Sequence, residues 1–177
     1  MENTIEIELS KKKLLFLLLG SAVFVALGIL FVLNPASIQS DLFGNLEFIR
    51  IVGVVSLVFF GLCFVYIATK LFDSKVGLRI YENGIIDNSN ATSVGLIDWE
   101  DITDIKTIQI ASNKILLVET SKPEKYIERA KNGLISRAMK ANYKMYGTPI
   151  LITSNSLKIK YDDLEKLLME EFGKRVK

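Results

Sequence analysis

The chain has 177 residues, half of them hydrophobic, and 22 Lys and Arg against 20 Asp and Glu leave a net charge of +2. So small a charge does not indicate nucleic-acid binding. The sequence contains no histidine and one cysteine, Cys63, which excludes the usual general base near neutral pH, imidazole or thiolate metal sites, and an intramolecular disulfide. We therefore expect no metal, no other cofactor, no catalytic residue and no enzymatic activity.

The N-terminal segment, residues 1–13, contains the stretch "NTIEIELS". Here Ile5 and Ile7 alternate with Glu6 and Glu8, a period of two that is typical of a strand. Two interpretations are open: an edge strand that joins the C-terminal domain, or a disordered tail.

Residues 14–69 contain two long apolar stretches, 14–33 and 51–69, neither of which carries a charge. A 20-residue helix reaches roughly 30 Å, the thickness of the hydrocarbon core of a bilayer. The first stretch follows three lysines, as a signal peptide would, but it is longer than a typical signal core and no small-x-small cleavage site directly follows it. The sequence therefore predicts two retained transmembrane helices.

The segment between these helices is short, so they must lie antiparallel and side by side as a hairpin. Each carries two glycines eight residues apart, Gly20 with Gly28 and Gly53 with Gly61. Small residues allow helix backbones to approach closely in lipid. This packing could occur within the hairpin or between copies of the chain, which leaves a homo-oligomer open.

Positive charges flank the hairpin at both of its ends. Lys11, Lys12 and Lys13 precede the first helix, and Lys70 and Lys75 follow the second, whereas the connecting loop holds one arginine. Because lysine and arginine concentrate on the cytoplasmic side of a membrane, we expect both termini in the cytoplasm.

Beyond the hairpin, the sequence predicts one domain over residues 76–177, built mostly of short strands. Asn83-Gly84, within "GLRIYENGIID", is a strong hairpin signal, and the polar "NSNATS" leads as a turn into "VGLIDW". Further strands are predicted in "DITDIKTIQIA" and "NKILLVET". A second hairpin is predicted in "TPILITSNSLKIKY", turning at residues 154–156. In the strand predicted in "DITDIKTIQIA", four isoleucines are expected to mark one side: Ile102, Ile105, Ile108 and Ile110.

The chain is predicted to end in an amphipathic helix. Asp162 and Glu165 have the spacing of a capping box, and Leu164 and Leu168 follow at helical spacing. Antiparallel strands followed by one helix predict an α+β fold. Its form would be a bent sheet or barrel plugged by the helix, in the order of a pleckstrin-homology (PH)-like domain.

The stretch "VGLIDWEDIT" contains three carboxylates within four positions, Asp98, Glu100 and Asp101. A pair of carboxylates facing one pocket would suit glycoside hydrolysis. On a strand, however, Asp98 and Glu100 share one face and Trp99 points to the other. We therefore expect Trp99 to anchor the corner in the core, and the carboxylates to form the solvent side of the strand and its turn.

Four segments, "GLRIYENGIID", "GLIDWEDITDI", "ANYKMYGTPILI" and "LKIKYDDLEKLL", resemble a bacterial family of uncharacterised small membrane proteins. Its members have two N-terminal transmembrane helices and a C-terminal PH-like domain. The resemblance covers residues 11–172, and its fold markers are Trp99, Gly147 and Pro149. It implies the fold and a multi-pass location in the bacterial inner membrane, but no activity and no ligand.

Residues 122–147 form a basic insert whose seven Lys or Arg outnumber its two Glu, a net charge of +5. Near-helical apolar spacing, from Tyr126 and Ile127 to Leu134, Ala138 and Ala141, predicts helical structure, and Gly133 could divide the insert into two helices. A basic helix tethered near a membrane suits anionic head groups. An ordinary solvated helix face is the other interpretation. The candidate contact residues are Lys125, Arg129, Lys131, Arg137, Lys140 and Lys144.

These observations favour a non-enzymatic interaction module anchored in the inner membrane. Its cytoplasmic domain would bind an unidentified protein partner or anionic lipid head groups. The main alternative is an immunity protein that neutralises a toxin at the inner membrane. A hydrolase that uses the carboxylates around Trp99 is the least favoured function, because no phosphate loop, nucleophile elbow or metal signature accompanies them.

Overall fold

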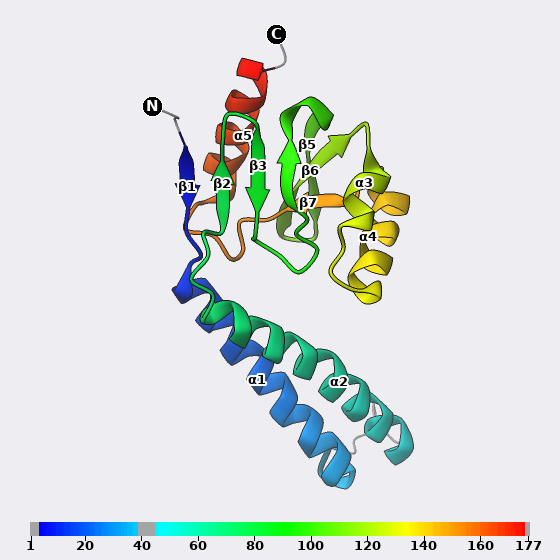
Figure 1. Cartoon of the computed structure of the whole chain (residues 1–177). Coiled ribbons are helices and arrows are strands. Elements are labelled where there is room, and N and C mark those ends of the chain that lie inside the picture. The colour runs from blue at the N-terminus through cyan, green and yellow to red at the C-terminus, as the bar shows by residue number, and fades with distance from the viewer. Residues whose placement is uncertain (1–3, 39–44, 176–177) are drawn as a thin grey trace. The chain divides into compact units, whose positions relative to one another are not determined.

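The computed structural model describes residues 4–38 and 45–175, and the chain divides into two compact units (Figure 1). One unit comprises residues 11–74. The other is discontinuous and combines residues 1–10 with residues 75–177. The first is a helical hairpin, and the second is a globular α+β unit.

The hairpin consists of α1 (Lys11–Leu33), the short 3-10 helix η1 (Pro35–Ile38) and α2 (Leu46–Leu71). Both long helices have the length and composition needed to cross a membrane, and they pack antiparallel as predicted. The side chain of Asn45 caps α2 by accepting hydrogen bonds from the backbone N–H groups of residues 47 and 48. At the other end, the Lys11 ammonium donates to the carbonyls of Leu71 and Asp73, which ties the start of α1 to the end of α2.

The two helices meet along a seam whose residues are spaced alternately four and three apart. This spacing is typical of a left-handed helix pair, in which side chains of one helix fill the gaps of the other. In α1 the buried or half-buried residues of this series are Leu14, Leu18, Ser21, Val25, Gly28 and Val32. In α2 they are Ile49, Gly53, Ser56, Phe60, Cys63 and Ile67.

Gly28 and Gly53 face each other where the helix backbones approach most closely. A Cβ atom on Gly53 would lie 2.8 Å from the Phe31 Cβ and 3.0 Å from the Gly28 carbonyl oxygen. Gly20 and Gly61, in contrast, have open space beside them. Packing within the hairpin therefore accounts for Gly28 and Gly53. Of the four glycines, Gly20 and Gly61 remain available for contact between copies of the chain.

The globular unit contains two antiparallel sheets. The four-stranded sheet has the order β1 (Ile5–Ile7), β2 (Leu78–Ile80), β3 (Gly84–Asp87), β4 (Gly95–Asp98). The three-stranded sheet has the order β5 (Ile102–Ile110), β6 (Asn113–Thr120), β7 (Ile150–Ile152). The predicted α+β class, with antiparallel strands and a final helix, α5 (Tyr161–Arg175), is confirmed. Among the described residues, the strands form two sheets rather than one closed barrel.

The N-terminal segment forms the edge strand β1, which pairs with β2 from Ile5↔Ile80 to Ile7↔Leu78. The chain therefore leaves the sheet after β1, forms the whole helical hairpin, and returns to the same sheet as β2. Leu9 extends the contact by bridging to Leu157. Since β1 and β2 are neighbours, α1 must begin and α2 must end on the same side of any membrane that the hairpin crosses.

The predicted hairpin at residues 154–156 is wrong. Only Ile150–Ile152 forms a strand there, and Leu157 pairs with the N-terminal segment instead. Leu157 is fully buried, and it lies so close to Gly77 that a Cβ there would come within 2.4 Å of its side chain.

The prediction for the start of the C-terminal helix is also wrong in detail. The helix α5 begins at Tyr161, so Asp162 lies inside its first turn rather than before it. The Asp162 carboxylate pairs with Lys114 at 2.8 Å, and Glu165 accepts a hydrogen bond from Thr107. Both carboxylates therefore tie α5 to the three-stranded sheet instead of forming a capping box.

The strand β5 contains an irregularity in its register between Ile102 and Asp104. This bulge places Ile102 and Ile105 together in the core although they are three positions apart. The register is regular from Asp104 to Ile110, so Ile108 and Ile110 lie on the face opposite Ile105. The prediction that all four isoleucines share one side is therefore wrong for these two residues.

Candidate interaction surface

The basic insert lies between β6 and β7 and forms two helices, α3 (Pro123–Glu128) and α4 (Gly133–Tyr146). The break covers residues 129–132. The Asn132 side chain then starts α4 by accepting a hydrogen bond from the Ile135 N–H at 2.9 Å. Gly133 is thus the first residue of the second helix, and Gly147, with a φ of 78°, ends it in the left-handed conformation.

The buried side of α4 is centred on Met139. Met139 is fully buried, with Ile135, Asn142 and Tyr146 half-buried beside it. Leu134, Ala138 and Ala141, which recur at near-helical spacing in the sequence, are exposed instead, Leu134 to 72%. The helix packs with positions one residue away from those that the apolar spacing singled out.

Three of the candidate basic residues, Arg137, Lys140 and Lys144, are exposed on α4. None of them has a hydrogen bond or ion pair with any residue that the structure describes. Lys131, in the break before α4, is likewise exposed. These four side chains are available to a ligand, and exposed Leu134 and Met145 lie on the same helix.

Lys125, by contrast, is engaged within the fold. Its ammonium contacts the carboxylates of Asp98, at 2.7 Å, and Asp101. Hydrogen bonds from Lys125 to Asp101 and then to Asp98 raise the pKa of the Lys125 ammonium well above its usual value. This lysine stabilises the contact between α3 and the corner after β4.

Asp101 is fully buried, which corrects the expectation that the acidic cluster is the solvent side of a strand. β4 ends at Asp98, and residues 99–101 form a 3-10 turn, η2 (Trp99–Asp101), that directs Asp101 inward. There it pairs with Lys122 at 2.6 Å and accepts a hydrogen bond from the Tyr126 hydroxyl at 2.8 Å.

The electrostatics of this buried group are dominated by its partners. Burial alone would raise the pKa of the Asp101 carboxyl, but hydrogen bonds from Lys122, Lys125 and Tyr126 hold it well below its usual value. Burial, followed by the bond to Asp101, raises the pKa of Tyr126 to about 12. The carboxylates of this corner thus hold α3 in place. No metal-binding cluster of three or more Asp, Glu or Cys occurs in the described part of the chain.

Arg129 is also used inside the globular unit. It donates to the Leu96 carbonyl at 2.6 Å, and its guanidinium stacks over the Tyr126 ring. The Tyr126 hydroxyl accepts from the Asp98 N–H at 3.2 Å. β4 is the last strand of the four-stranded sheet. The Arg129 and Tyr126 side chains therefore form hydrogen bonds with backbone groups on the outer edge of that sheet.

Trp99 anchors the corner, as its position in the sequence suggests. It is 6% exposed, and its indole N–H donates to the Tyr81 carbonyl at 3.0 Å. The Arg175 guanidinium, from the end of α5, lies 4.7 Å from the ring centre. An open cleft of about 710 Å³ adjoins these two side chains. The cleft is lined by Glu82, Asn83, Leu96, Asp98, Trp99, Glu100, Ile102 and Arg175.

The remaining fold markers position β7. Gly147 ends α4, the Thr148 hydroxyl donates to the Val118 carbonyl of β6, and Pro149 is buried. On the opposite edge of β7, the Asn90 amide donates to the Leu151 carbonyl at 2.6 Å.

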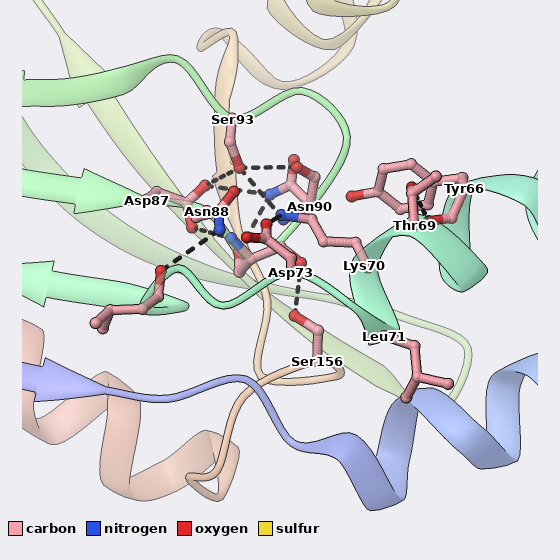
Figure 2. Close-up of polar contacts among 12 residues, drawn as sticks. Tyr66, Thr69, Lys70, Leu71, Asp73, Asp87, Asn88, Asn90, Ser93 and Ser156 are labelled. Atoms are coloured by element: carbon pink, nitrogen blue, oxygen red, sulfur yellow. Dashed lines mark hydrogen bonds and ion pairs between the residues drawn. The ribbon is translucent and has the colours of Figure 1, made fainter.

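The loop that carries Asn90 is held by its own polar side chains, drawn in Figure 2. The Ser93 hydroxyl donates to Asp87 at 2.8 Å, and the Asn90 amide reaches the same carboxylate at 3.4 Å (Figure 2). The predicted polar turn "NSNATS" is therefore an ordered turn between β3 and β4, and its Asn90 side chain also contacts β7 of the other sheet.

Comparison of the chain with known protein families, with curated proteins and with solved structures finds no match.

Proposed function

We propose that this chain is a non-enzymatic interaction module of the bacterial inner membrane. In this proposal α1 and α2 cross the membrane, and the globular unit lies in the cytoplasm, where it binds a protein partner or an anionic lipid surface. The single observation that carries the proposal is the exposed side of α4. It combines large exposed apolar residues with basic ones that have no ion pair among the described residues.

The anchoring part of the proposal is supported by composition and by connectivity. Both helices are long and apolar enough to span a bilayer. The pairing of β1 with β2 requires both flanks of the hairpin to lie in one compartment. Lysines precede α1 and follow α2, which favours the cytoplasm as that compartment.

The proposed PH-like architecture of the globular unit is supported by its strand arrangement. A four-stranded and a three-stranded antiparallel sheet are followed by the C-terminal α5. Leu164 and Leu168 of α5 are fully buried. Since such folds serve many functions, the choice of a binding role rests on the α4 surface.

That surface has the features of a contact site. Leu134 and Met145 are 72% and 64% exposed, although burying such a side chain is favourable by about 2 kcal/mol. The adjacent Arg137, Lys140 and Lys144 lack partners among the described residues. Apolar exposure beside uncompensated charge is typical of a surface that another molecule covers.

Site-specific photo-crosslinking in intact membranes tests the proposal. A photoreactive residue at position 134 should give crosslinked products, and the same residue at Lys166, on the exposed side of α5, should give none. Replacement of Arg137, Lys140 and Lys144 by glutamine should reduce the products from position 134. Equal crosslinking at positions 134 and 166 would contradict the proposal, and specific capture of a toxin would support the immunity function instead.

A further inference from the structure

α4 exposes two neighbouring stripes of different chemistry. At 3.6 residues per turn, Leu134, Ala138, Ala141 and Met145 fall within an arc of roughly 60°. Arg137, Lys140 and Lys144 occupy an adjoining arc of about the same width. The buried stripe around Met139 lies on the other side of the apolar one. We call the exposed arcs the apolar stripe and the basic stripe of α4.

We propose that α4 lies flat in the head-group layer of an anionic membrane, with its apolar stripe inserted and its basic stripe in contact with lipid phosphates. This inference rests on the proposed function, because it specifies what the same surface binds. An interfacial helix has this arrangement: apolar residues at the acyl boundary and lysine or arginine at the level of the head groups.

The charge of α4 favours an anionic surface. The helix carries Arg137, Lys140 and Lys144 and contains no aspartate or glutamate. A nearby carboxylate could neutralise this charge, but among the described residues no carboxylate forms an ion pair with these three side chains. Anionic lipid supplies the missing negative charge over the full length of the stripe.

The residue types distinguish a lipid surface from a protein. Protein–protein interfaces are enriched in aromatic residues and arginine and depleted of lysine. Here two of the three basic residues are Lys140 and Lys144, and the apolar stripe holds Ala138 and Ala141 between its larger ends. Such a stripe offers no deep anchor for a protein pocket, but it suits shallow insertion along a fluid surface.

The covalent anchor makes weak insertion sufficient. A helix of 14 residues with three charges binds a membrane weakly by itself. The globular unit is attached to both ends of the hairpin, and only residues 72–77 separate α2 from β2. If the hairpin spans the bilayer, these short connections keep α4 at a high effective concentration near the lipid surface.

The helix α5, which also exposes one side to solvent, provides an internal control. It carries both signs of charge, and its exposed Lys166 lies near Glu170, four residues away. A probe on α5 reports the environment of the globular unit without the basic stripe.

The test uses the full chain, reconstituted in vesicles, with one fluorescent label at a time. Cys63 is the only cysteine, so Cys63→Ala allows an environment-sensitive label on Met145→Cys or, as the control, on Lys166→Cys. The vesicles contain phosphatidylcholine alone, or phosphatidylcholine with phosphatidylglycerol. A lipid with a quencher in its acyl chain reports insertion.

We expect the label at position 145 to be quenched in the anionic vesicles and the label at position 166 to remain unquenched in both. Each basic residue near an anionic surface favours binding by about fivefold. Replacing Arg137, Lys140 and Lys144 by glutamine should therefore lower the ratio of inserted to free α4 on the order of 100-fold. The fluorescence of Trp99 checks that this variant is folded.

Equal quenching at position 145 in neutral and anionic vesicles would overturn the inference, and so would quenching that the triple glutamine variant retains. Absence of quenching in vesicles, together with specific protein crosslinks from position 134 in intact membranes, would overturn the lipid inference and leave the proposed function standing. Absence of both would refute the two proposals together.

Discussion

At the scale of single residues, the buried Asp101 carboxylate holds the insert to the rest of the globular unit. It belongs to the turn after β4, whereas Lys122, Lys125 and Tyr126 come from the start of the insert. A buried carboxylate is tolerated only when charged and hydrogen-bonding partners replace water. Asp101 is therefore the group that gathers the largest number of these partners around the start of the insert.

Replacement of Asp101 by asparagine should reduce the free energy of unfolding by about 2 kcal/mol, because the change weakens the charge-assisted hydrogen bonds from Lys122 and Lys125. Denaturation followed by Trp99 fluorescence measures this loss, since Trp99 is the only tryptophan and lies in the globular unit. The neighbouring Glu100 is exposed, and Glu100→Gln should change stability by less than about 0.5 kcal/mol. Equal effects of the two substitutions would refute the role of Asp101.

The pH dependence of stability should report the same group. The pKa of Asp101 is lower in the folded state than in the unfolded chain, so its contribution is complete above the unfolded value, about 3.9. This contribution is lost as the pH falls below that value toward the folded pKa. Denaturation between neutral and strongly acidic pH should therefore show a smaller loss of stability for Asp101→Asn than for the unsubstituted chain. An identical pH profile would contradict the assignment.

Gly84 is required by a close approach of two strands. A Cβ at this position would lie 2.3 Å from the Ile97 carbonyl oxygen, which is backbone and cannot move aside alone. We expect Gly84→Ala to destabilise the globular unit by about 2 to 3 kcal/mol, as overpacking does. Gly133 has open space around it, and Gly133→Ala should be neutral or stabilising. Comparable Tm losses for the two variants would contradict this explanation.

The candidate site was only partly predictable at this scale. The basic charge of Arg137, Lys140 and Lys144 and their common side follow from helical spacing alone. Lys125 and Arg129 have the same residue types, but their partners Asp98, Asp101 and Leu96 lie on a distant segment. Only the tertiary structure distinguishes a basic side chain that is used in the fold from one that is available.

At the scale of elements, the longest patterns were the most predictable. The two apolar stretches became α1 and α2, and "GLRIYENGIID" became the hairpin of β2 and β3. The short stretch around Leu157 was misread because a local hairpin and a contact with Leu9 suit the same sequence equally well. The apolar spacing of the insert predicted a helix but not its buried side, because alanines fit either side of a helix.

The seam of the hairpin gives a test at this scale. Gly53→Val should push α1 and α2 apart, because a Cβ would already lie within 3.0 Å of the Gly28 carbonyl and of Phe31. Gly61→Val, on the same helix with open space beside it, should leave the hairpin intact. A disulfide between cysteines introduced across the seam measures the approach of the helices. We expect its yield to fall severalfold only in Gly53→Val, and an equal fall in both variants would contradict the seam.

At the scale of the whole molecule, the chain folds with its helical hairpin inserted between two neighbouring strands. β1 precedes the hairpin, β2 follows it, and Ile7 and Leu9 of the N-terminal segment are buried. Full burial of two such side chains contributes about 3 to 6 kcal/mol, which is comparable to the stability of a whole small domain. The globular unit is therefore complete only when both segments are present.

This connectivity predicts how the chain tolerates truncation. Joining Ser10 to Lys75 through a short Gly-Ser linker, without residues 11–74, should give a globular unit with a cooperative unfolding transition. Residues 75–177 alone lack β1 and should lose that transition or unfold at much lower denaturant concentration. Equal stability of the two proteins, measured by Trp99 fluorescence, would show that β1 contributes nothing.

The central claim, an anchor that crosses the membrane with the globular unit on the cytoplasmic side, is tested most directly by cysteine labelling in intact cells. In a Cys63→Ala background, Ala36→Cys lies in η1 between the helices, and Ala91→Cys lies in the globular unit; both positions are exposed. We expect a membrane-impermeant maleimide to label position 36 from outside, and to label position 91 only after the membrane is opened. Labelling of position 91 in intact cells, or equal protection of both positions, would contradict the claim.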